Sequence, residues 1–411
     1  MELFDRCLDE YADLLVRVGV NIQKGQTLVL SCPVTCADFG RRCARAAYAA
    51  GCGEVVMNWK DDTLARYKYL YAKEEVFDVT PQWEQDFYNN YAKEGAAYLV
   101  IAATDPLNLA GVDPDRMTRA TRSRGRDLAP FYERQMNDSF AWCIGSVPIA
   151  AWSKKVFPSL SEADADAALW QAIFRAVRVE GDGGAPARWA AHAARLAERT
   201  ETLNRYRFVS LHYESETGTD YTVSLPKGHI WQGGAENCRA GYPFIANIPT
   251  EEIFTAPDCR TGNGVLCASR PLVYHGNIIR NLRFEVQDGR IIRATASEGE
   301  DILRAAIAVD DGAARFGELA LVPYDSPISN ENLLFFETLF DENAACHIAF
   351  GEAYPCLEGG ADMSKAELAA HGLNDSITHV DFMIGTPDLS ITGKTADGRE
   401  IPVFRHGNFA F

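Results

Sequence analysis

The stretch His379-Val-Asp381 places an imidazole and a carboxylate two residues apart, inside the largely apolar run HVDFMIG. On a β-strand, residues two apart project from the same face, so both side chains can enter one cavity. An imidazole and a carboxylate at this spacing suit zinc or another borderline divalent ion. A histidine paired with an aspartate on a strand would use the same spacing, so the pair alone leaves both interpretations open.

Other polar residues of the same half of the chain also lie in apolar surroundings. His347 has small and apolar neighbours in NAACHIAFG, and Glu318 interrupts the apolar segment RFGELALV. Glu251 and Glu252 are adjacent acids between Pro249 and the run IFTAP. Adjacent residues of a strand point to opposite faces, so only one of these two acids would face the core unless the proline kinks the segment. A buried carboxylate or imidazole needs a hydrogen-bonded, charged or metal partner.

Taken together, these acids and histidines suit a pair of divalent ions about 3.5–4 Å apart, bridged by a carboxylate and a water molecule. Ion-paired acids and hydrogen-bonded core histidines would account for the same residues. The chain has no H-E-x-x-H helix, no G-x-S-x-G elbow and no phosphate-binding P-loop. A zincin, an α/β-hydrolase and a P-loop nucleotide enzyme are therefore disfavoured.

The composition is that of a soluble globular protein. Of 411 residues, 57 are acidic and 40 are lysine or arginine, which gives a formal net charge of −17. This charge repels phosphate groups, so we expect neither nucleic acid nor an anionic membrane as a partner. The N-terminus MELFDRCLDEYADLL lacks the basic and apolar regions of a signal peptide. Eleven cysteines without a framework spacing indicate reduced thiols, and we expect a cytoplasmic protein.

The first half of the chain alternates helix and strand patterns. Apolar residues recur at helical spacing from Leu3 to Leu15, and an alanine-rich helix is expected over 36–50. Short apolar runs at 27–30, 54–57 and 97–102 are typical of buried strands. This alternation predicts an N-terminal α/β domain, residues 1–200, with a mostly parallel sheet. The glycines at 51 and 53 stand between a helix and a strand, the reverse of a dinucleotide fingerprint.

The second half changes to strands and turns after the break GDGGAP at 181–186 and one further helix. Asp288-Gly289 and Asp397-Gly398 each separate two strand-like runs, and Asp-Gly between strands predicts a two-residue hairpin turn. These patterns predict an α+β, β-rich C-terminal domain over residues 201–411, which would carry the candidate metal site.

Four long motifs add a resemblance: NIPTEEIFTAPD (247–258), RFGELALVPYDSPIS (315–329), LFDENAACHIAFGEAYP (339–355) and NDSITHVDFMIGT (374–386). In these motifs and over nearly its whole length, the chain resembles the thermophilic-type metallo-aminopeptidase family of aminopeptidase T, aminopeptidase S and PepS. The resemblance implies an N-terminal α/β domain, a C-terminal metal domain and a homodimer. It also implies a centre of two divalent ions (zinc, cobalt or manganese) held by Glu252, Glu318, His347, His379 and Asp381.

The function that this resemblance implies is release of N-terminal amino acids from peptides by a water activated at two metals. Tyr354 of GEAYP is similar to a family tyrosine at the metal centre, where it is a ligand or a close neighbour that stabilises the oxyanion. Glu251 is our first candidate for the general base and Glu342 the second. We interpret Cys346 and Cys356 as buried apolar residues rather than ligands.

Two alternative functions stay open from the sequence. One is a metal-dependent dipeptidase or amidase that acts on a single small substrate. The other is a non-catalytic, dimeric metal-binding protein. Peptide substrates of rising length, with and without a blocked amine, would separate an aminopeptidase from the first alternative. Hydrolysis that a chelator abolishes would separate it from the second.

Overall fold

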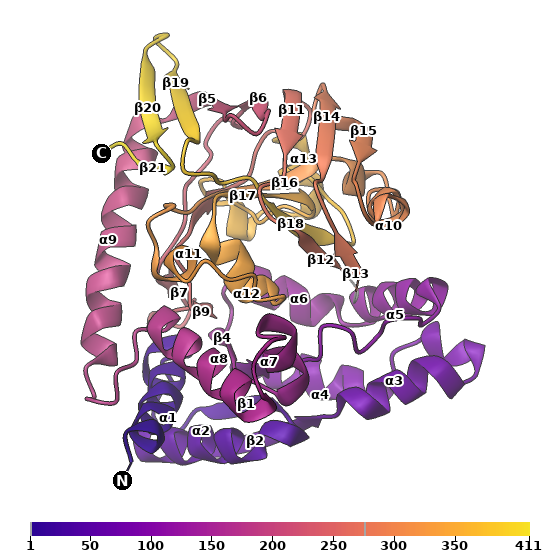
Figure 1. The fold of residues 1–411 in the computed structure, drawn as a ribbon, viewed down its shortest axis with the longest axis vertical. Coiled ribbons are helices and arrows are strands. Elements are labelled where there is room, and N and C mark those ends of the chain that lie inside the picture. The colour runs from indigo at the N-terminus through magenta and orange to yellow at the C-terminus, as the bar shows by residue number, and fades with distance from the viewer. Residues whose placement is uncertain (1, 275–276) are drawn as a thin grey trace. The chain divides into compact units, whose positions relative to one another are not determined.

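The computed structural model describes residues 2–274 and 277–411. The backbone groups into two compact units, Met1–Ala193 with Ala235–Pro249, and Ala194–Gly234 with Thr250–Phe411. The first unit is α/β and the second is β-rich, which confirms the predicted fold class (Figure 1). The segment 235–249 belongs to the first unit although it follows residue 200. The domains 1–200 and 201–411 stay a prediction, because a compact unit need not fold independently.

A five-stranded parallel sheet organises the first unit. Its strands, in spatial order, are β2 (Glu54–Lys60), β1 (Thr27–Pro33), β3 (Ala97–Ala102), β4 (Trp142–Ser146) and β9 (Asn247–Ile248). The three strands expected at 27–30, 54–57 and 97–102 are confirmed. The sequence patterns missed β4 and β9, and the two residues of β9 complete the sheet from far along the chain.

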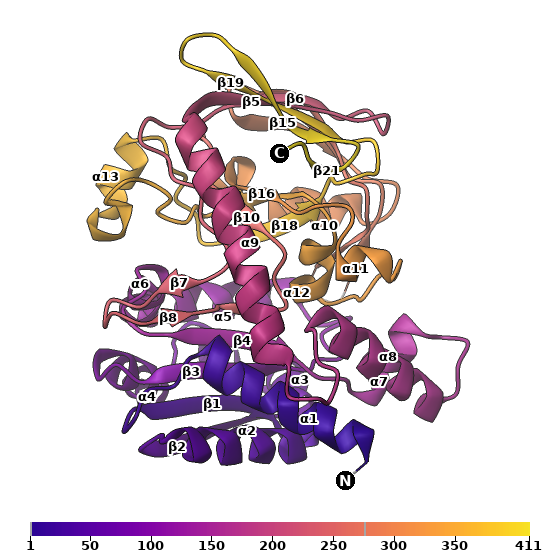
Figure 2. The same ribbon diagram turned by 90° about the vertical axis from the view of Figure 1, so that its left-hand side faces the viewer.

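Helices cover both faces of this sheet (Figure 2). On one face, Tyr11 and Leu15 pack against Gly145 of β4, and α2 (Ala37–Ala50) packs on β1 beside α1 (Leu3–Leu14). On the other face, Tyr88 of α4 (Gln82–Lys93) and Phe131 of α6 (Ala129–Met136) join the strand residues in one apolar cluster. The remaining α-helices that begin in this unit are α3 (Asp62–Tyr71), α5 (Pro114–Asp127), α7 (Ala150–Val156), α8 (Glu162–Ala176) and α9 (Ala185–Tyr206).

Two antiparallel sheets form the second unit. The larger has eight strands, in the order β15 (Arg290–Thr295), β14 (Arg283–Gln287), β11 (Asn263–Cys267), β6 (Asp220–Ser224), β5 (Phe208–Glu214), β19 (Ser390–Thr395), β20 (Glu400–Arg405) and β21 (Asn408–Phe409). The smaller has four: β10 (Ile253–Thr255), β16 (Phe316–Leu321), β17 (His347–Gly351) and β18 (His379–Met383). Both Asp-Gly pairs lie in hairpin turns, but only the first turn has the predicted two residues. Asp288 and Gly289 have φ angles of 48° and 73°, as a tight hairpin requires. In the second hairpin Thr395 pairs with Arg399, so the turn has three residues, with Gly398 at a φ of 84°.

Short elements complete the described chain. The α-helices of the second unit besides the end of α9 are α10 (Glu300–Ala306), α11 (Pro327–Asn330), α12 (Thr338–Asp341) and α13 (Lys365–Ala370). The small hairpins are β7 (Glu236–Asn237) with β8 (Pro243–Phe244) in the first unit, and β12 (Leu272–Tyr274) with β13 (Asn277–Ile279) in the second.

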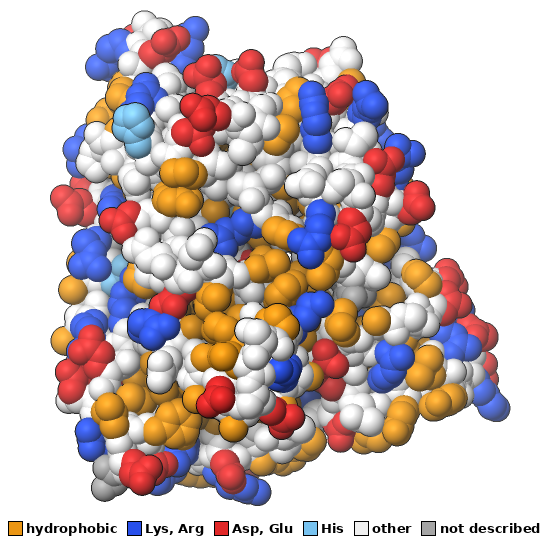
Figure 3. Space-filling model, in the orientation of Figure 1, with side chains coloured by type: hydrophobic (Ala, Val, Ile, Leu, Met, Phe, Trp, Pro, Cys, Tyr) orange, Lys and Arg blue, Asp and Glu red, His pale blue; other side chains and the backbone are white. Residues whose placement is uncertain are grey.

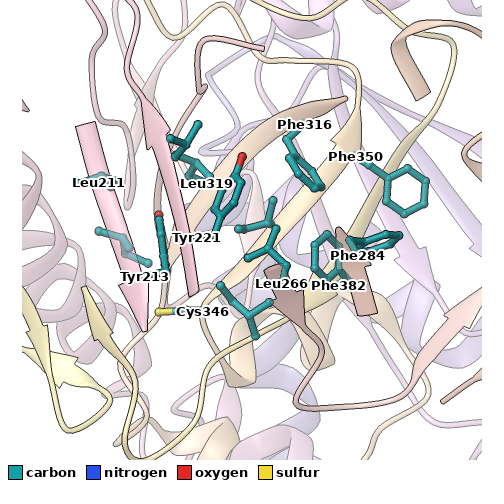
Figure 4. Packing of buried hydrophobic residues seen from close by; sticks show 14 of the residues in the cluster. Leu211, Tyr213, Tyr221, Leu266, Phe284, Phe316, Leu319, Cys346, Phe350 and Phe382 are labelled. Carbon is teal, nitrogen blue, oxygen red and sulfur yellow. The ribbon is translucent and has the colours of Figure 1, made fainter. Parts of the chain in front are cut away.

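The core of the second unit lies between its two sheets (Figure 4). From the smaller sheet, Leu319, Phe350 and Phe382 are fully buried, and they meet Phe284 and Leu266 of the larger one. The rings of Phe284 and Phe382 lie 4.9 Å apart, edge to face. Burying one such side chain contributes about 1.5–3 kcal/mol. Because apolar residues fill this face of the smaller sheet, its polar residues must lie on the other face.

The visible surface mixes charges of both signs. On the face drawn in Figure 3, acidic and basic side chains alternate, and those described form no broad basic field. Within residues 2–274 and 277–411, no helix combines the length and apolar character required to cross a bilayer.

Candidate metal centre

The smaller sheet of the second unit gathers the candidate residues on the face that points away from its core. Its register sets Glu318 of β16 opposite Ala349 of β17, and Ala349 opposite Asp381 of β18. Alternate residues of a strand share a face, so His347, two before Ala349, and His379, two before Asp381, lie on this same face. The small side chain of Ala349 leaves room in the middle for the longer ones around it.

A β-bulge at Gly317 helps to aim Glu318. The pairing of β16 with β17 shifts by one residue between Phe316 and Glu318, which leaves Gly317 as the extra residue. Bulges of this kind turn the neighbouring side chain and occur often beside functional sites. A Cβ atom on Gly317 would lie 2.3 Å from the carbonyl oxygen of Glu352, closer than real Cβ contacts come. Only glycine therefore fits here without a backbone movement.

We expect Gly317→Ala to lower the stability of the protein by about 1–3 kcal/mol, because the added methyl group forces strands β16 and β17 apart. The movement should also displace Glu318 and reduce the metal content of the purified protein. Gly125→Ala is the matched control, since a Cβ at this α5 position meets no atom within 4 Å. Alanine there should be neutral or stabilise the helix by up to about 1 kcal/mol. Equal melting temperatures for the two variants would contradict the steric argument.

The five residues form two groups that share Glu318. Glu252, Glu318 and His347 make one group, and Glu318, His379 and Asp381 make the other, with the ligand atoms of each group within 4.8 Å of one another. The Nε2 atom of His347 lies 3.2 Å from Glu252 Oε2 and 3.6 Å from Glu318 Oε1. The Nε2 atom of His379 lies 3.5 Å from Glu318 Oε2 and 3.4 Å from Asp381 Oδ1. The two oxygens of Glu318 thus face different histidines.

Backbone carbonyl groups fix the orientation of both imidazoles. The Nδ1 atom of His347 lies 3.2 Å from the carbonyl oxygen of Ala345, and Nδ1 of His379 lies 2.8 Å from that of Glu352. A carbonyl oxygen only accepts, so Nδ1 carries the proton and donates in both rings. The Nε2 atoms then point at the carboxylates. A histidine held in this way presents Nε2 as a metal ligand.

The pKa values within the cluster reflect concentrated buried negative charge. Burial works against protonation of His347, yet its hydrogen bonds to Glu252 and Glu318 outweigh burial and raise its pKa well above the usual value. Burial opposes protonation of His379 in the same way, but the charge and hydrogen bond of Asp381 and the charge of Glu318 together outweigh burial and raise the pKa of His379 to about 10. Burial raises the pKa of Glu318. Such a cluster attracts positive charge, which is the electrostatic setting of a divalent-cation site.

The adjacent side chains of Glu251 and Glu252 have different surroundings. The side chain of Ile253 belongs to the core, so alternation along the extended chain directs Glu252 to the opposite face, where His347 lies. Glu251 is buried but belongs to neither ligand group. Burial and the charge of Arg195 lower the pKa of Arg199 in α9. The negative charge of Glu251 raises the pKa of Arg199 and so partly offsets them. The geometry thus places Glu252, not Glu251, beside the other candidate ligands.

Glu342 faces the cluster from the short turn before β17. Glu342 is half-buried, and burial of its carboxyl group together with the charges of Asp381 and Glu252 raises its pKa well above the usual value. The side chain of Asn343 donates a hydrogen bond of 3.4 Å to Glu342 Oε1. Glu342 belongs to neither ligand group, although its charge acts on the members of both. The sequence signal was only its position in FDENAACH, five residues before His347.

Tyr354 also lies beside the cluster, whereas the two cysteines do not belong to it. The ring of Tyr354 meets that of His379 edge to face, with centroids 5.9 Å apart. The Cys346 thiol is in the core and donates to the carbonyl oxygen of Val322 at 3.3 Å. The Cys356 thiol donates to the side-chain oxygen of Gln232 at 3.2 Å. Neither thiol belongs to a ligand group among the described residues.

Comparison with known proteins decides the family. A family model described as thermophilic metalloprotease (M29) matches residues 4–409. This chain belongs to the M29 family. It is similar to aminopeptidase AmpS of Bacillus subtilis (strain 168), with 44% identity over 412 residues and 100% coverage of both chains. It is also similar to aminopeptidase T of Thermus thermophilus, with 39% identity over 409 residues and 100% coverage of both.

The solved structures agree with the M29 assignment. The structure of wild-type AmpT from Thermus thermophilus matches with a TM-score of 0.92 and 39% identity, over 99% of this chain and 100% of that one. A dioxygenase for 2,5-dihydroxypyridine from Pseudomonas putida KT2440 matches with a TM-score of 0.55 and 10% identity, which shows a shared fold alone. The resemblance seen in the sequence is confirmed, and this M29 chain is a hydrolase that acts on peptide bonds.

The residues present fit the divalent metal that an M29 metalloprotease requires. Two imidazole nitrogens and three carboxylates converge, and all are ligands that zinc, cobalt and manganese accept. Each histidine already has its second nitrogen hydrogen-bonded to a carbonyl group, as metal-binding histidines usually do. Burial of Glu318 and His347 is explained by the same assignment, because a bound cation offsets the cost of burying charged groups.

Proposed function

We propose that this M29 chain is an aminopeptidase that removes N-terminal amino acids from peptides at a dinuclear metal centre. The observation that carries the proposal is the position of Glu318, whose two oxygens face two separate histidines. Glu252 and His347 would hold one divalent ion, His379 and Asp381 the other, and Glu318 would bind both. The relatives named aminopeptidases support removal of residues from the N-terminus. Zinc, cobalt and manganese all suit these ligands.

Divalent ions in such a site supply Lewis-acid activation of the peptide carbonyl group and of water. Glu342 is the general base in this proposal: it accepts the proton of the attacking water and passes it to the leaving amine. Cations beside Glu342 would lower the pKa of its carboxyl group, which keeps it ionised for this task. Tyr354 donates a hydrogen bond to the oxyanion of the tetrahedral intermediate. We assign Glu251 a structural role rather than a catalytic one, since its negative charge stabilises the charged form of Arg199.

We also propose that the enzyme works as a homodimer in the cytoplasm on peptides with a free N-terminus. All eleven cysteines are free in the structure, which suits a reducing compartment. The dimer follows from the family resemblance. Sedimentation of the purified protein would test it, and a monomer at micromolar concentration would contradict it.

Treatment with a chelator should abolish hydrolysis of aminoacyl anilides and of short peptides, and added zinc, cobalt or manganese should restore it. Acetylation of the N-terminus should stop cleavage of the same peptides, because an aminopeptidase recognises the free amine. Peptides of two to six residues, with and without the acetyl group, separate the alternatives. Cleavage of blocked peptides at an equal rate would identify an amidase, and activity confined to the shortest would identify a dipeptidase. Metal binding without chelator-sensitive hydrolysis would leave a non-catalytic metal protein.

A further inference from the structure

Asn343 connects the two segments that approach the cluster from outside the sheet. It is fully buried in the turn after α12. Its Oδ1 atom accepts a 2.8 Å hydrogen bond from the backbone N–H of Glu251, the residue directly before Glu252. Its Nδ2 atom donates to the carbonyl oxygen of Leu339 at 3.0 Å and to Glu342 Oε1 at 3.4 Å. One side chain thus holds both the backbone that leads to a candidate ligand and the candidate base.

The chemistry of its partners determines how the amide of Asn343 is oriented. A backbone N–H can only donate, so the amide oxygen must face Glu251. A carbonyl oxygen and a carboxylate can only accept, so the NH₂ group must face Leu339 and Glu342. The reversed orientation would set like groups against each other at all three contacts. The hydrogen bonds therefore work together, and losing one leaves a buried partner unsatisfied.

We infer that Asn343 is a positioning residue that sets the spacing between Glu252 and Glu342, an inference that rests on the proposed function. The planar amide transmits any shift of the turn at 342–344 to the backbone before β10, and the reverse. Without it, the carboxylate of Glu342 loses a donor, and the peptide N–H before Glu252 loses its acceptor. Both carboxylates then sample positions away from the productive geometry. Groups that orient ligands from behind typically matter by about 10- to 100-fold in metal affinity or activity.

Two variants test this, Asn343→Ala and Asn343→Leu. Alanine leaves a cavity, whereas leucine keeps the branched outline of asparagine in a somewhat larger, apolar side chain, so an effect that both variants share cannot come from a collapsed cavity alone. With metal at saturation, both should lower kcat about 10- to 100-fold and leave KM nearly unchanged. Calorimetric titration of zinc into the chelator-treated variants should show a zinc affinity about 10-fold weaker than that of the wild-type protein. The titration measures zinc affinity without turnover, so it tests the position of the candidate ligand Glu252 separately from catalysis.

Asn204→Ala is the matched control. Asn204 of α9 also uses both amide atoms, with the backbone of Trp231 at 2.7 and 3.0 Å, and neither bond involves a carboxylate. Its loss should lower the melting temperature and leave kcat and zinc affinity unchanged. If the Asn343 variants have a lower melting temperature but unchanged kcat and zinc affinity, Asn343 has no positioning role. A wild-type protein that releases no amino acid from free peptides would overturn the proposed function instead. The zinc titration would still show whether Asn343 affects metal affinity, because it does not depend on catalysis.

Discussion

Glu318→Ala should remove both metal ions from the protein and lower kcat/KM by more than about 100-fold. The size follows from the position of Glu318, whose two oxygens lie near His347 and His379 and belong to both ligand groups. Loss of a residue that merely orients a ligand already reduces metal affinity or activity by about 10- to 100-fold. Loss of the shared carboxylate removes one ligand from each ion at once. Elemental analysis of the purified variant and steady-state kinetics measure the two effects.

Glu285→Ala provides the control for Glu318→Ala. Glu285 also lies on a strand of the second unit, but its carboxylate forms ion pairs with Arg283 and Arg293 at 3.7 and 3.5 Å on the surface. Surface pairs contribute about 0–1 kcal/mol, so this variant should keep its metal and its activity. Glu318→Ala protein with both ions and near-normal kcat/KM would show that Glu318 does not bridge them.

Glu342→Gln should keep both metal ions and lower kcat by about 10²- to 10⁴-fold, the usual contribution of a general base. Glutamine has the same shape and still accepts the hydrogen bond from Asn343, but its amide cannot take up a proton. The ligand groups do not include Glu342, so their geometry should persist. Metal analysis together with kcat and KM measures the result.

Glu251→Gln is the same chemical change on the other acid considered for the base, and it should leave kcat close to the wild-type value. The structure supports this contrast, because the charge of Glu251 acts on Arg199 while that of Glu342 acts on the cluster. If Glu251→Gln loses turnover and Glu342→Gln does not, the roles must be exchanged. If Glu342→Gln loses metal, Glu342 is a ligand rather than the base.

Local patterns in the sequence predicted much of the fold. The strands at 27–30, 54–57 and 97–102 and the two hairpins at the Asp-Gly pairs depend on neighbouring residues, and the structure contains all of them, although the turn at Asp397-Gly398 is one residue longer than predicted. The same local reasoning placed His379 and Asp381 on one face, because side chains in a strand alternate with a period of two. Types and spacing also marked Glu318 and His347, whose polar groups interrupt apolar runs. Types and spacing suggested that they form one metal centre but left ion-paired acids and core histidines as an equal interpretation, and the resemblance to a family favoured the metal centre.

Long-range pairing accounts for what the sequence could not show. Which of Glu251 and Glu252 faces the cluster depends on the register of β10 against β16, and an offset of one residue would exchange them. The bulge at Gly317 exists only because β17 pairs with both sides of it. Strand β9 joins the sheet of the first unit although about a hundred residues separate it from β4 in the sequence. Glu342 reaches the cluster through the fold of the turn before β17, for which no short motif exists.

Crystals grown with excess zinc or cobalt, and measured at the absorption edge of the metal, give the most direct test of the proposed centre. The anomalous difference map should contain two peaks per chain at the candidate metal centre. One peak should contact Glu252 and His347, the other His379 and Asp381, and Glu318 should contact both. A single peak, or two peaks with no shared carboxylate, would contradict a dinuclear centre bridged by Glu318.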